Sequence, residues 1–319
     1  MTPESLIAAT DPGTFADPAP IFRPSARRAA AAPTAARPDR VVRDVRPRGR
    51  VVAVASGKGG VGKTNVAVNV AIGLAGAGQR VLLVDADVGL ANVDLVLGRR
   101  PRAHLGHVLA GHADLESVVQ DGPAGIRWVP GASHPANLAA AAEPLRDALA
   151  DGLAALERAH DLVMLDLPAG IGPGVLPQVR HADEILLVTT PEPPAVMDAY
   201  SLLKAAATGA DEPLGPVGLV VNIVSHRRDA HRVHERLVAA ARRFLNVEID
   251  FLGYVFCDGH VGRAVQKQQP VTLAYPHSQA AWCMKRVAGA LLEGSQRPRR
   301  GPRPAFLRRL ANLFGGFAR

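Results

Sequence analysis

A glycine-rich segment, GKGGVGKT at residues 57–64, has the clearest potential for chemistry in this sequence. It matches the spacing GxxxxGK[ST] and follows an apolar run at residues 51–55 that is typical of a strand. Glycines let backbone N–H groups curl around an anion, and the helix expected next adds its positive N-terminal end. We therefore expect Lys63 to neutralise phosphate oxygens and Thr64 to hold Mg²⁺. The predicted nucleotide contacts are Gly57, Lys58, Gly59, Gly60, Val61, Gly62, Lys63 and Thr64.

Acidic residues follow two other apolar runs. Asp85 and Asp87 come at the end of residues 81–87, and Asp166 closes residues 162–166. Two carboxylates two positions apart share one face of a regular strand, and a loop can equally turn both toward a phosphate. The segment LPAGIG after Asp166 fits a mobile loop that senses phosphate, with Asp166 itself as an acidic Mg²⁺ partner.

The arrangement of apolar runs predicts the fold that positions these residues. Short, near-continuously apolar runs alternate with segments of helical length, which is typical of strands covered on both faces. We expect an α/β fold with a doubly wound, mostly parallel sheet, in which ligands bind beyond the carboxyl ends of the strands. Strands are expected at 51–55, 81–87, 126–132, 162–170, 185–192, 217–225 and 251–256, and helices at 63–77, 142–158, 195–207 and 229–243.

Composition divides the chain further. Residues 1–49 are rich in Ala, Pro and Arg without a strand or helix period, which predicts a disordered arm, inert or partner-binding. One domain at 50–293 is expected, followed by a basic linker at 294–303 and an amphipathic helix at 304–319. The net charge is +8, and seven arginines but no acidic residue follow Glu293, which weakens any inference of a basic groove on the domain.

Several function classes lack the residues they need. The two cysteines, Cys257 and Cys283, form no CxxC, which argues against zinc, a disulfide framework or an iron–sulfur scaffold. We see no apolar run long enough to span a bilayer and no secretory signal, so we expect a cytoplasmic protein. A bacterial tyrosine kinase of related fold would normally end in a tyrosine cluster, whereas no Tyr follows Tyr275.

The loop GKGGVGKT resembles the deviant Walker A loop of the MinD/ParA superfamily of P-loop ATPases. The resemblance implies ATP with Mg²⁺, and a homodimer that forms with ATP because Lys58 contacts nucleotide across the interface. It also implies that Asp85 belongs to the Mg²⁺ second shell, that Asp87 orients the attacking water and that Asn222 reads the adenine. At Leu167 the sequence departs from the Ser or Thr usual in the family, so one hydroxyl contact is lost.

Longer segments, including GLANVDLVLG and TTPEPPAVMDAYSLLK, resemble the FlhG (FleN) family within this superfamily over about residues 51–292. That resemblance implies a switch regulating flagellar number or placement. The implied partners are the GTPase FlhF, flagellar switch or C-ring proteins and a flagellar transcription regulator. The arm shows no DQAxxLR-like element, so stimulation of FlhF is not implied. A ParA-like ATPase for DNA or cargo partitioning and a non-hydrolysing adaptor remain alternatives, and a nucleic-acid partner is not expected.

The end of the chain, PAFLRRLANLFGGFAR, places apolar residues at helical spacing opposite Arg308 and Arg309. This pattern is typical of an interfacial helix, although a final helix docked on the core is the alternative. Membrane-targeting tails of MinD resemble it. We therefore expect ATP-dependent, peripheral association with an anionic membrane surface at the inner face of the cell membrane.

Overall fold

The computed structural model describes residues 48–87, 91–131, 143–208, 210 and 212–294. The predicted arm at 1–49 lies outside these residues except for its last two positions, and so do the linker from 295 and the helix predicted at 304–319. Those expectations stay predictions. The described residues belong to one folded unit, which contains the glycine-rich loop.

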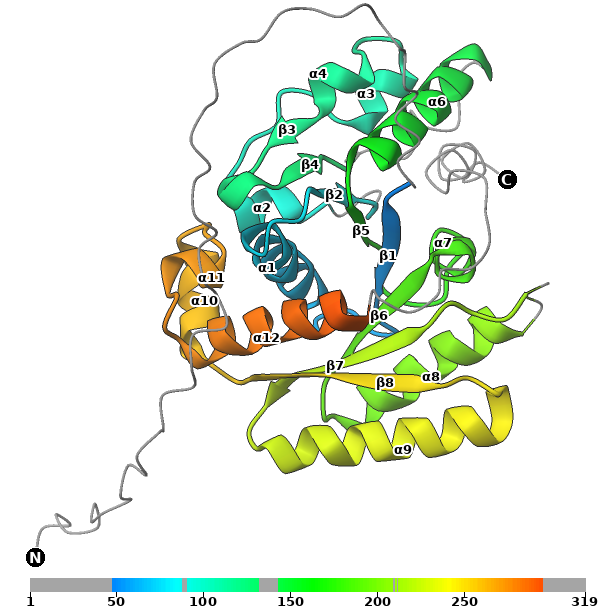
Figure 1. The fold of residues 1–319 in the computed structure, drawn as a ribbon, viewed down its shortest axis with the longest axis vertical. Coiled ribbons are helices and arrows are strands. Elements are labelled where there is room, and N and C mark those ends of the chain that lie inside the picture. Colours follow the sequence, from blue (N-terminus) through cyan, green and yellow to red (C-terminus); the bar gives the residue numbers. More distant parts are fainter. Residues whose placement is uncertain (1–47, 88–90, 132–142, 209, 211, 295–319) are drawn as a thin grey trace, which may run out of the picture. The chain divides into compact units, whose positions relative to one another are not determined.

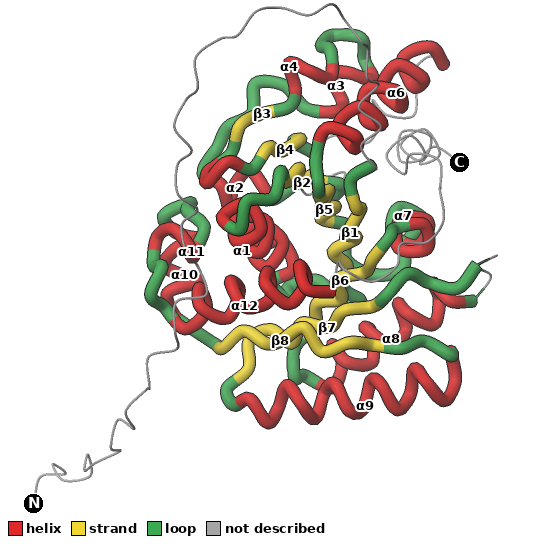
Figure 2. The backbone as a smooth tube through the Cα atoms, viewed as in Figure 1, coloured by secondary structure: helices red, strands yellow, loops and turns green. Residues whose placement is uncertain are grey.

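One mostly parallel sheet organises this unit (Figures 1 and 2). Its strand order is β3-β4-β2-β5-β1-β6-β7-β8, and only the short pair β3–β4 is antiparallel. The predicted fold class is confirmed. The strands are β1 (Arg50–Ala55), β2 (Val81–Asp85), β3 (Gln120–Asp121), β4 (Arg127–Val129), β5 (Leu162–Asp166), β6 (Glu184–Thr189), β7 (Val217–Val224) and β8 (Ile249–Phe256).

Helices cover both faces of the sheet, and two separate apolar clusters form the core. The first face carries α3 (Leu105–Leu109), α4 (Leu115–Val118), α6 (Glu143–Ala159), α7 (Leu176–His181), α8 (Pro193–Ala207) and α9 (Arg227–Leu245). The second face carries α1 (Lys63–Gly76), α2 (Val93–Leu97), α10 (Gly259–Gln266), α11 (Val271–Ala274) and α12 (Gln279–Gly294). A single-turn 3-10 helix, η1 (Pro123–Gly125), precedes β4.

The central strand explains why these runs are apolar throughout. In β1, Val51 and Ala53 pack into the first cluster, whereas Val52 and Val54 pack into the second. All four are fully buried, because successive side chains point to opposite faces and both faces are covered by helices. The carboxyl ends of the central strands therefore converge on one edge, where the glycine-rich loop begins.

The structure adds elements that the sequence analysis did not name. The amphipathic helix α12 packs along β8 and α1, and α10 and α11 lead into it. The helices α2, α3 and α4 have only four or five residues, too short for a periodic apolar pattern. The four predicted helices at 63–77, 142–158, 195–207 and 229–243 correspond to α1, α6, α8 and α9, with ends shifted by at most two residues.

Candidate nucleotide site

The glycine-rich loop joins β1 to α1 and has backbone angles that favour glycine. Gly60 and Gly62 have φ of 80° and 81°, in the left-handed region that other residues rarely adopt. A Cβ on Gly57 would lie 2.0 Å from the carbonyl oxygen of Asp198, so no side chain fits there. α1 then starts at Lys63 with no side-chain cap and no acidic residue in its first turn. The loop and the positive end of this helix suit an anion such as phosphate.

Asp166 joins the two phosphate-loop side chains that the sequence singled out. Lys63 Nζ lies 2.6 Å from Asp166 Oδ1, and the Thr64 hydroxyl donates to Asp166 Oδ2 at 2.6 Å. Lys63 and Asp166 are 7% and 1% exposed, so this ion pair is buried. Asp166 stands at the carboxyl end of β5, beside Val54 of β1 and Asp85 of β2. Parallel pairing thus brings together residues that are about 100 positions apart.

Asp85 and Asp87 bring further negative charge to the same edge. Asp85 is 1% exposed and accepts hydrogen bonds of 3.1 Å from the backbone N–H groups of Asp87, Asn92 and Val93. Burial and the neighbouring charge of Asp166 raise the pKa of Asp85 to about 7, against these hydrogen bonds. Burial also raises the pKa of the half-buried Asp87, while the charge of Lys63 opposes this shift and that of Asp166 adds to it. The site therefore holds more buried negative charge than Lys63 balances.

The donor set fits Mg²⁺ bound together with a nucleotide. Within the described part of the chain, no group of three or more His, Cys, Asp and Glu side chains could hold a metal ion unaided. Mg²⁺ usually takes one or two protein oxygens and fills its other positions with water and substrate phosphates. Thr64, Asp85 and Asp166 supply hard oxygen donors, and a cation would relieve the mutual repulsion of the two carboxylates.

Lys58 occupies a different position from Lys63. Its side chain is 42% exposed at the rim of the loop, where Nζ lies 3.2 Å from Glu192 Oε2. Ser56 supports the turn, because its hydroxyl donates to the Lys58 carbonyl at 3.0 Å. One loop thus carries one buried lysine and one lysine that faces outward.

Asn222 ties β7 to the loop. Its side chain is 6% exposed, and Nδ2 donates to the Val61 carbonyl at 2.8 Å. A Cβ on Gly62 would lie 2.4 Å from this nitrogen, so a side chain at 62 would displace the Asn222 amide in addition to straining φ. The structure therefore places the predicted adenine-reading residue against the loop backbone.

A cleft of about 380 Å³ opens beside the loop. Thr190 is 5% exposed in its wall, and its Oγ1 has no hydrogen-bond partner among the described residues. Ile223 lines the cleft with φ of 57°, which is unusual for a β-branched residue and is typical of strain stored at functional sites. The cleft residues that the sequence analysis missed are Thr190, Pro191, Glu192, Ile223, Ser225 and Asp229. Their only signal was a position at the end of β7, directly after β6 or β7, or at the start of α9.

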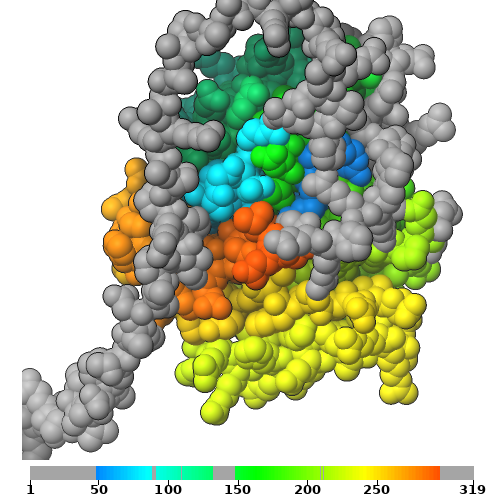
Figure 3. Space-filling view, viewed as in Figure 1, coloured from blue at the N-terminus to red at the C-terminus, as the bar shows by residue number. Residues whose placement is uncertain are grey.

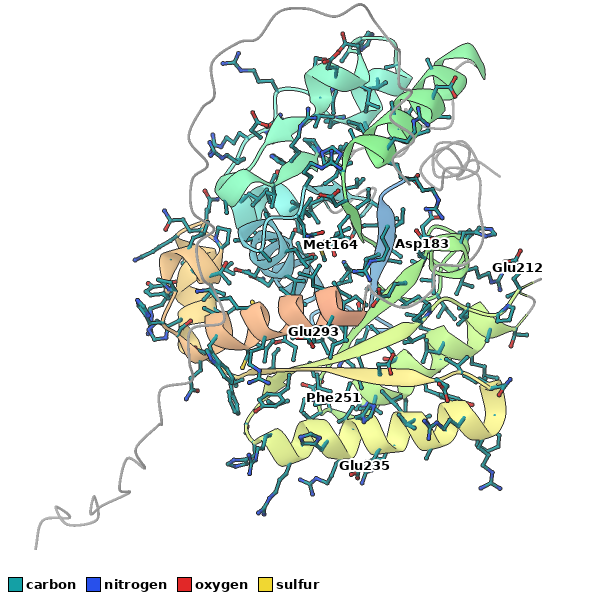
Figure 4. The ribbon with its side chains drawn as sticks, viewed as in Figure 1. Met164, Asp183, Glu212, Glu235, Phe251 and Glu293 are labelled. Atoms are coloured by element: carbon teal, nitrogen blue, oxygen red, sulfur yellow. The ribbon has the colours of Figure 1, made fainter. Side chains whose placement is uncertain are left out.

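A larger hollow of about 890 Å³ lies next to this cleft and shares Ser225 and Asp229 with it. It is lined mainly by charged and polar residues at the start of α9, including Glu235, which Figure 4 labels, and by Phe256 of β8.

Leu167 stands where the MinD/ParA superfamily usually has Ser or Thr. Its side chain is fully buried in the first apolar cluster, and its backbone N–H donates to the Val54 carbonyl at 3.2 Å. The residue therefore anchors the segment after Asp166 by packing.

The fold and this site define a nucleotide-binding P-loop protein, and comparison with known families agrees. Residues 52–271 match the CobQ/CobB/MinD/ParA nucleotide binding domain. The chain belongs to this family, and it is an ATPase that uses ATP with Mg²⁺.

Individual relatives are of the MinD type. The chain is 38% identical over 239 residues to the antiactivator FleN of Pseudomonas aeruginosa, which covers 75% of this chain and 85% of FleN. It is 29% identical over 246 residues to the flagellum site-determining protein YlxH of Helicobacter pylori, covering 76% and 82% of the two chains. The structure resembles MinD of Pyrococcus horikoshii in complex with Mg-ADP, with a TM-score of 0.62, 26% identity and coverage of 78% and 98%. This chain is therefore a MinD/ParA-type regulatory ATPase.

Proposed function

We propose that this chain is an ATP-dependent dimeric switch that regulates the number or placement of flagella. The observation that carries the switch is the unequal placement of two lysines in one loop. Lys63 is buried on Asp166, where it serves its own site, whereas Lys58 is 42% exposed and directed to the rim. A lysine at the rim is free to exchange Glu192 for an anionic group on a second molecule.

Each residue then has a defined task in the proposed cycle. ATP supplies the phosphoryl group, and Mg²⁺ neutralises charge on its phosphate oxygens. Lys63 and the loop backbone hold the phosphates, while Thr64, Asp85 and Asp166 supply the oxygens for the cation. Asp87, half-buried at the same edge, orients the attacking water. Lys58 couples the site to a partner subunit, and Asn222 holds the loop against the base-binding side of the site.

The flagellar assignment is supported by the relatives. FleN is described as an antiactivator and YlxH as a flagellum site-determining protein, and the chain spans more than four fifths of each. We infer partners of the corresponding kinds: the GTPase FlhF, switch or C-ring proteins, and a flagellar transcription regulator. Deleting the gene in its host and counting flagella by electron microscopy tests this assignment. Unchanged number and position would remove it.

Light scattering tests the switch directly. The intact chain is sized with ADP, with ATP and with a non-hydrolysable ATP analogue. We expect a monomer with ADP and a dimer with the analogue. The γ-phosphate adds negative charge at the site, and Lys58 of the second molecule can pair with that charge. One mass in all three conditions would overturn the dimeric switch, while ATP hydrolysis would still be measured separately.

Membrane association is the second part of the proposal. In the described residues no helix has the length and apolar character to cross a bilayer. The segment 304–319 lies outside them, and its sequence is typical of an interfacial helix preceded by arginines. Two such segments on one dimer would bind more tightly than one, through effective concentration. Sedimentation with anionic vesicles should therefore need ATP, and truncation before Pro304 should abolish it without reducing nucleotide binding.

One observation favours ParA-like partitioning as a second candidate. The helix α9 presents six arginines on the surface of the folded domain, at positions 227, 228, 232, 236, 242 and 243. Duplex DNA binding would draw on such a row of cations. A filter-binding titration of the chain truncated before Pro304 separates the two functions. ATP-dependent DNA binding by that chain would favour partitioning, and its absence would favour the flagellar switch.

A further inference from the structure

The surface formed by α10, α11 and α12 has an unusual charge pattern. From Gly259 to Leu292 the chain has four Lys or Arg residues and no Asp or Glu. The domain's other cationic surface, on α9, is interleaved with acids, since Arg232 pairs with Asp229 and Arg242 lies 3.7 Å from Glu248. The α10–α12 cations have no carboxylate partner within the described residues. They are Arg263, Lys267, Lys285 and Arg286.

Aromatic rings take the place of the missing carboxylates. Arg263 and Lys267 lie 5.8 Å and 5.0 Å from the centre of the Tyr275 ring. Arg286 lies 4.9 Å from the ring of Trp282, one helical turn earlier. These contacts hold the positive groups at the surface without neutralising them.

Direct contacts join these residues into one surface. Lys285 Nζ donates to the carbonyl of Pro276, the residue after Tyr275, at 3.4 Å. On α12, Trp282, Lys285 and Arg286 share the exposed stripe at spacings of three and four residues. We name this surface the basic aromatic face and define it by Arg263, Lys267, Tyr275, Trp282, Lys285 and Arg286. The same three helices form the orange part of the molecule in Figure 3.

The apolar groups on these helices are exposed as well. Trp282 is 45% exposed, Leu273 44% and Val265 43%, although the buried sides of the same helices fill the second core cluster. Trp and Tyr with cations and exposed aliphatic side chains are characteristic of protein surfaces that sit at a membrane interface. A nucleic-acid surface would gain from the cations and rings, but it has no use for exposed Leu and Val.

We propose that the basic aromatic face is a second membrane-contact surface, on the folded domain, that lies against an anionic phospholipid bilayer. The face does not depend on the nucleotide switch, because none of its residues belongs to the candidate nucleotide site. It is compatible with simultaneous binding of the chain end. Gly294 is roughly 18 Å along α12 from Trp282, and the ten residues to Pro304 can span roughly 33 Å.

Vesicle binding of the full chain tests the charge of the face. The test variant is Lys267→Gln with Arg286→Gln. The matched control is Arg236→Gln with Arg243→Gln on α9, which removes the same charge from the other side of the sheet and also takes a cation from a ring, since Arg243 lies 5.2 Å from Phe244. With vesicles of three parts phosphatidylcholine and one part phosphatidylglycerol, each lost cation should weaken binding about fivefold. The test variant should therefore bind roughly twentyfold more weakly, and the control should match the unmodified chain.

Tryptophan fluorescence tests contact with the bilayer directly. The chain has two tryptophans, and Trp128 is fully buried in β4, so a change of environment on binding reports Trp282. We expect a blue shift on anionic vesicles, quenching by brominated phosphatidylcholine, and neither effect in Trp282→Phe.

Each outcome of these experiments either supports or overturns the proposal. Equal binding by the test variant and the unmodified chain overturns the proposal. Trp282 emission that does not change when vesicles bind overturns it as well. Loss of duplex DNA binding with unchanged vesicle binding would assign the face to nucleic acid and overturn it too. A twentyfold loss for the test variant with the same affinity in ADP and ATP would support the face while removing the nucleotide coupling of the proposed function.

Discussion

Charged side chains are arranged differently at the amino ends and at the carboxyl ends of the central strands. At the amino ends, Arg48 and Arg50 each have a carboxylate beside them. At the carboxyl ends, carboxylates outnumber the buried cation, and one lysine of the loop is held at the rim. The strands themselves are equally apolar, so the difference lies in the residues that begin and end them.

The amino ends form a matched set. Arg48 lies 2.7 Å from Asp183 and 2.9 Å from the buried Glu157, and Asp183 also accepts from the N–H of Val51 (Figure 4). Arg50 lies 2.7 Å from Glu184, with both side chains less than a tenth exposed. Each charged group of this set has an oppositely charged partner within the set.

The carboxyl ends are unmatched. Burial and Asp166 raise the pKa of Asp85 to about 7, and the Thr190 hydroxyl has no partner among the described residues. Surplus buried carboxylates and an unpaired hydroxyl cost stability. Such groups are typical of sites where a bound ligand pairs with them. In this molecule, balanced buried charges therefore mark a structural site, whereas a surplus of buried carboxylates marks a functional one.

The largest expected effect is at the unmatched end. Lys63→Ala should reduce ATP hydrolysis at least a thousandfold or abolish nucleotide binding, because catalysis of phosphoryl transfer is chiefly electrostatic. Phosphate release and binding of a fluorescent ATP analogue measure it, and circular dichroism verifies the fold. Near-normal hydrolysis would contradict the functional assignment of the carboxyl ends, since the buried Lys63 would then be structural.

A substitution at the amino ends of the strands should lower stability and leave ATP hydrolysis unchanged. Arg50→Ala leaves Glu184 buried without this partner and removes the donor to the Leu291 carbonyl, so the free energy of unfolding should fall by about 3 kcal/mol. Urea unfolding measures the loss, and hydrolysis per folded molecule should stay unchanged. The control is Arg80→Ala, whose pair with Asp161 is about two-fifths exposed on both sides and should be worth about 1 kcal/mol or less. A larger loss for Arg80 than for Arg50 would contradict the assignment.

The sequence predicted every described strand except β3, although some were expected to run up to four residues further, and the positions of Lys63, Asp85 and Asp166 at the strand ends have a physical reason. Buried parallel strands are continuously apolar, and Lys63, Asp85 and Asp166 stand next to such runs, so their convergence follows from parallel pairing. The matched ends could not be predicted, because Arg50 and Glu184 are 134 positions apart and many carboxylates could have met that arginine. The cleft was missed for a similar reason. Thr190 directly follows β6 and Ile223 is the second-last residue of β7, so both line the cleft through the path of the backbone where two different strands end, and Ile223 does so with an uncommon φ.

Two further variants at the carboxyl ends separate ATP hydrolysis from dimerisation. Asp87→Ala should bind ATP and dimerise but hydrolyse roughly a hundredfold more slowly, because it loses the group that orients water while the loop stays whole. Lys58→Ala should bind ATP and stay monomeric. Light scattering beside phosphate release distinguishes them. Two monomers in ATP would show that the roles of these residues are wrong.

The smallest expected effect concerns the contact that holds Lys58 at the rim. Its ion pair with Glu192 is exposed on both sides, at 42% and 65%, so it can stabilise the outward position only slightly. Glu192→Gln removes this competitor for the lysine, and the ATP-bound dimer should therefore form more tightly, by at most about fivefold. The dissociation constant comes from light scattering across a dilution series with a non-hydrolysable analogue. Glu248→Gln is the matched control, since it breaks the exposed contact with Arg242 at 3.7 Å, away from the loop. The difference between the two variants should shrink at high salt, because exposed charges are screened. A weaker dimer for Glu192→Gln would mean that Glu192 itself belongs to the interface, and Lys58 would then be positioned for its partner by this contact instead of being held back by it.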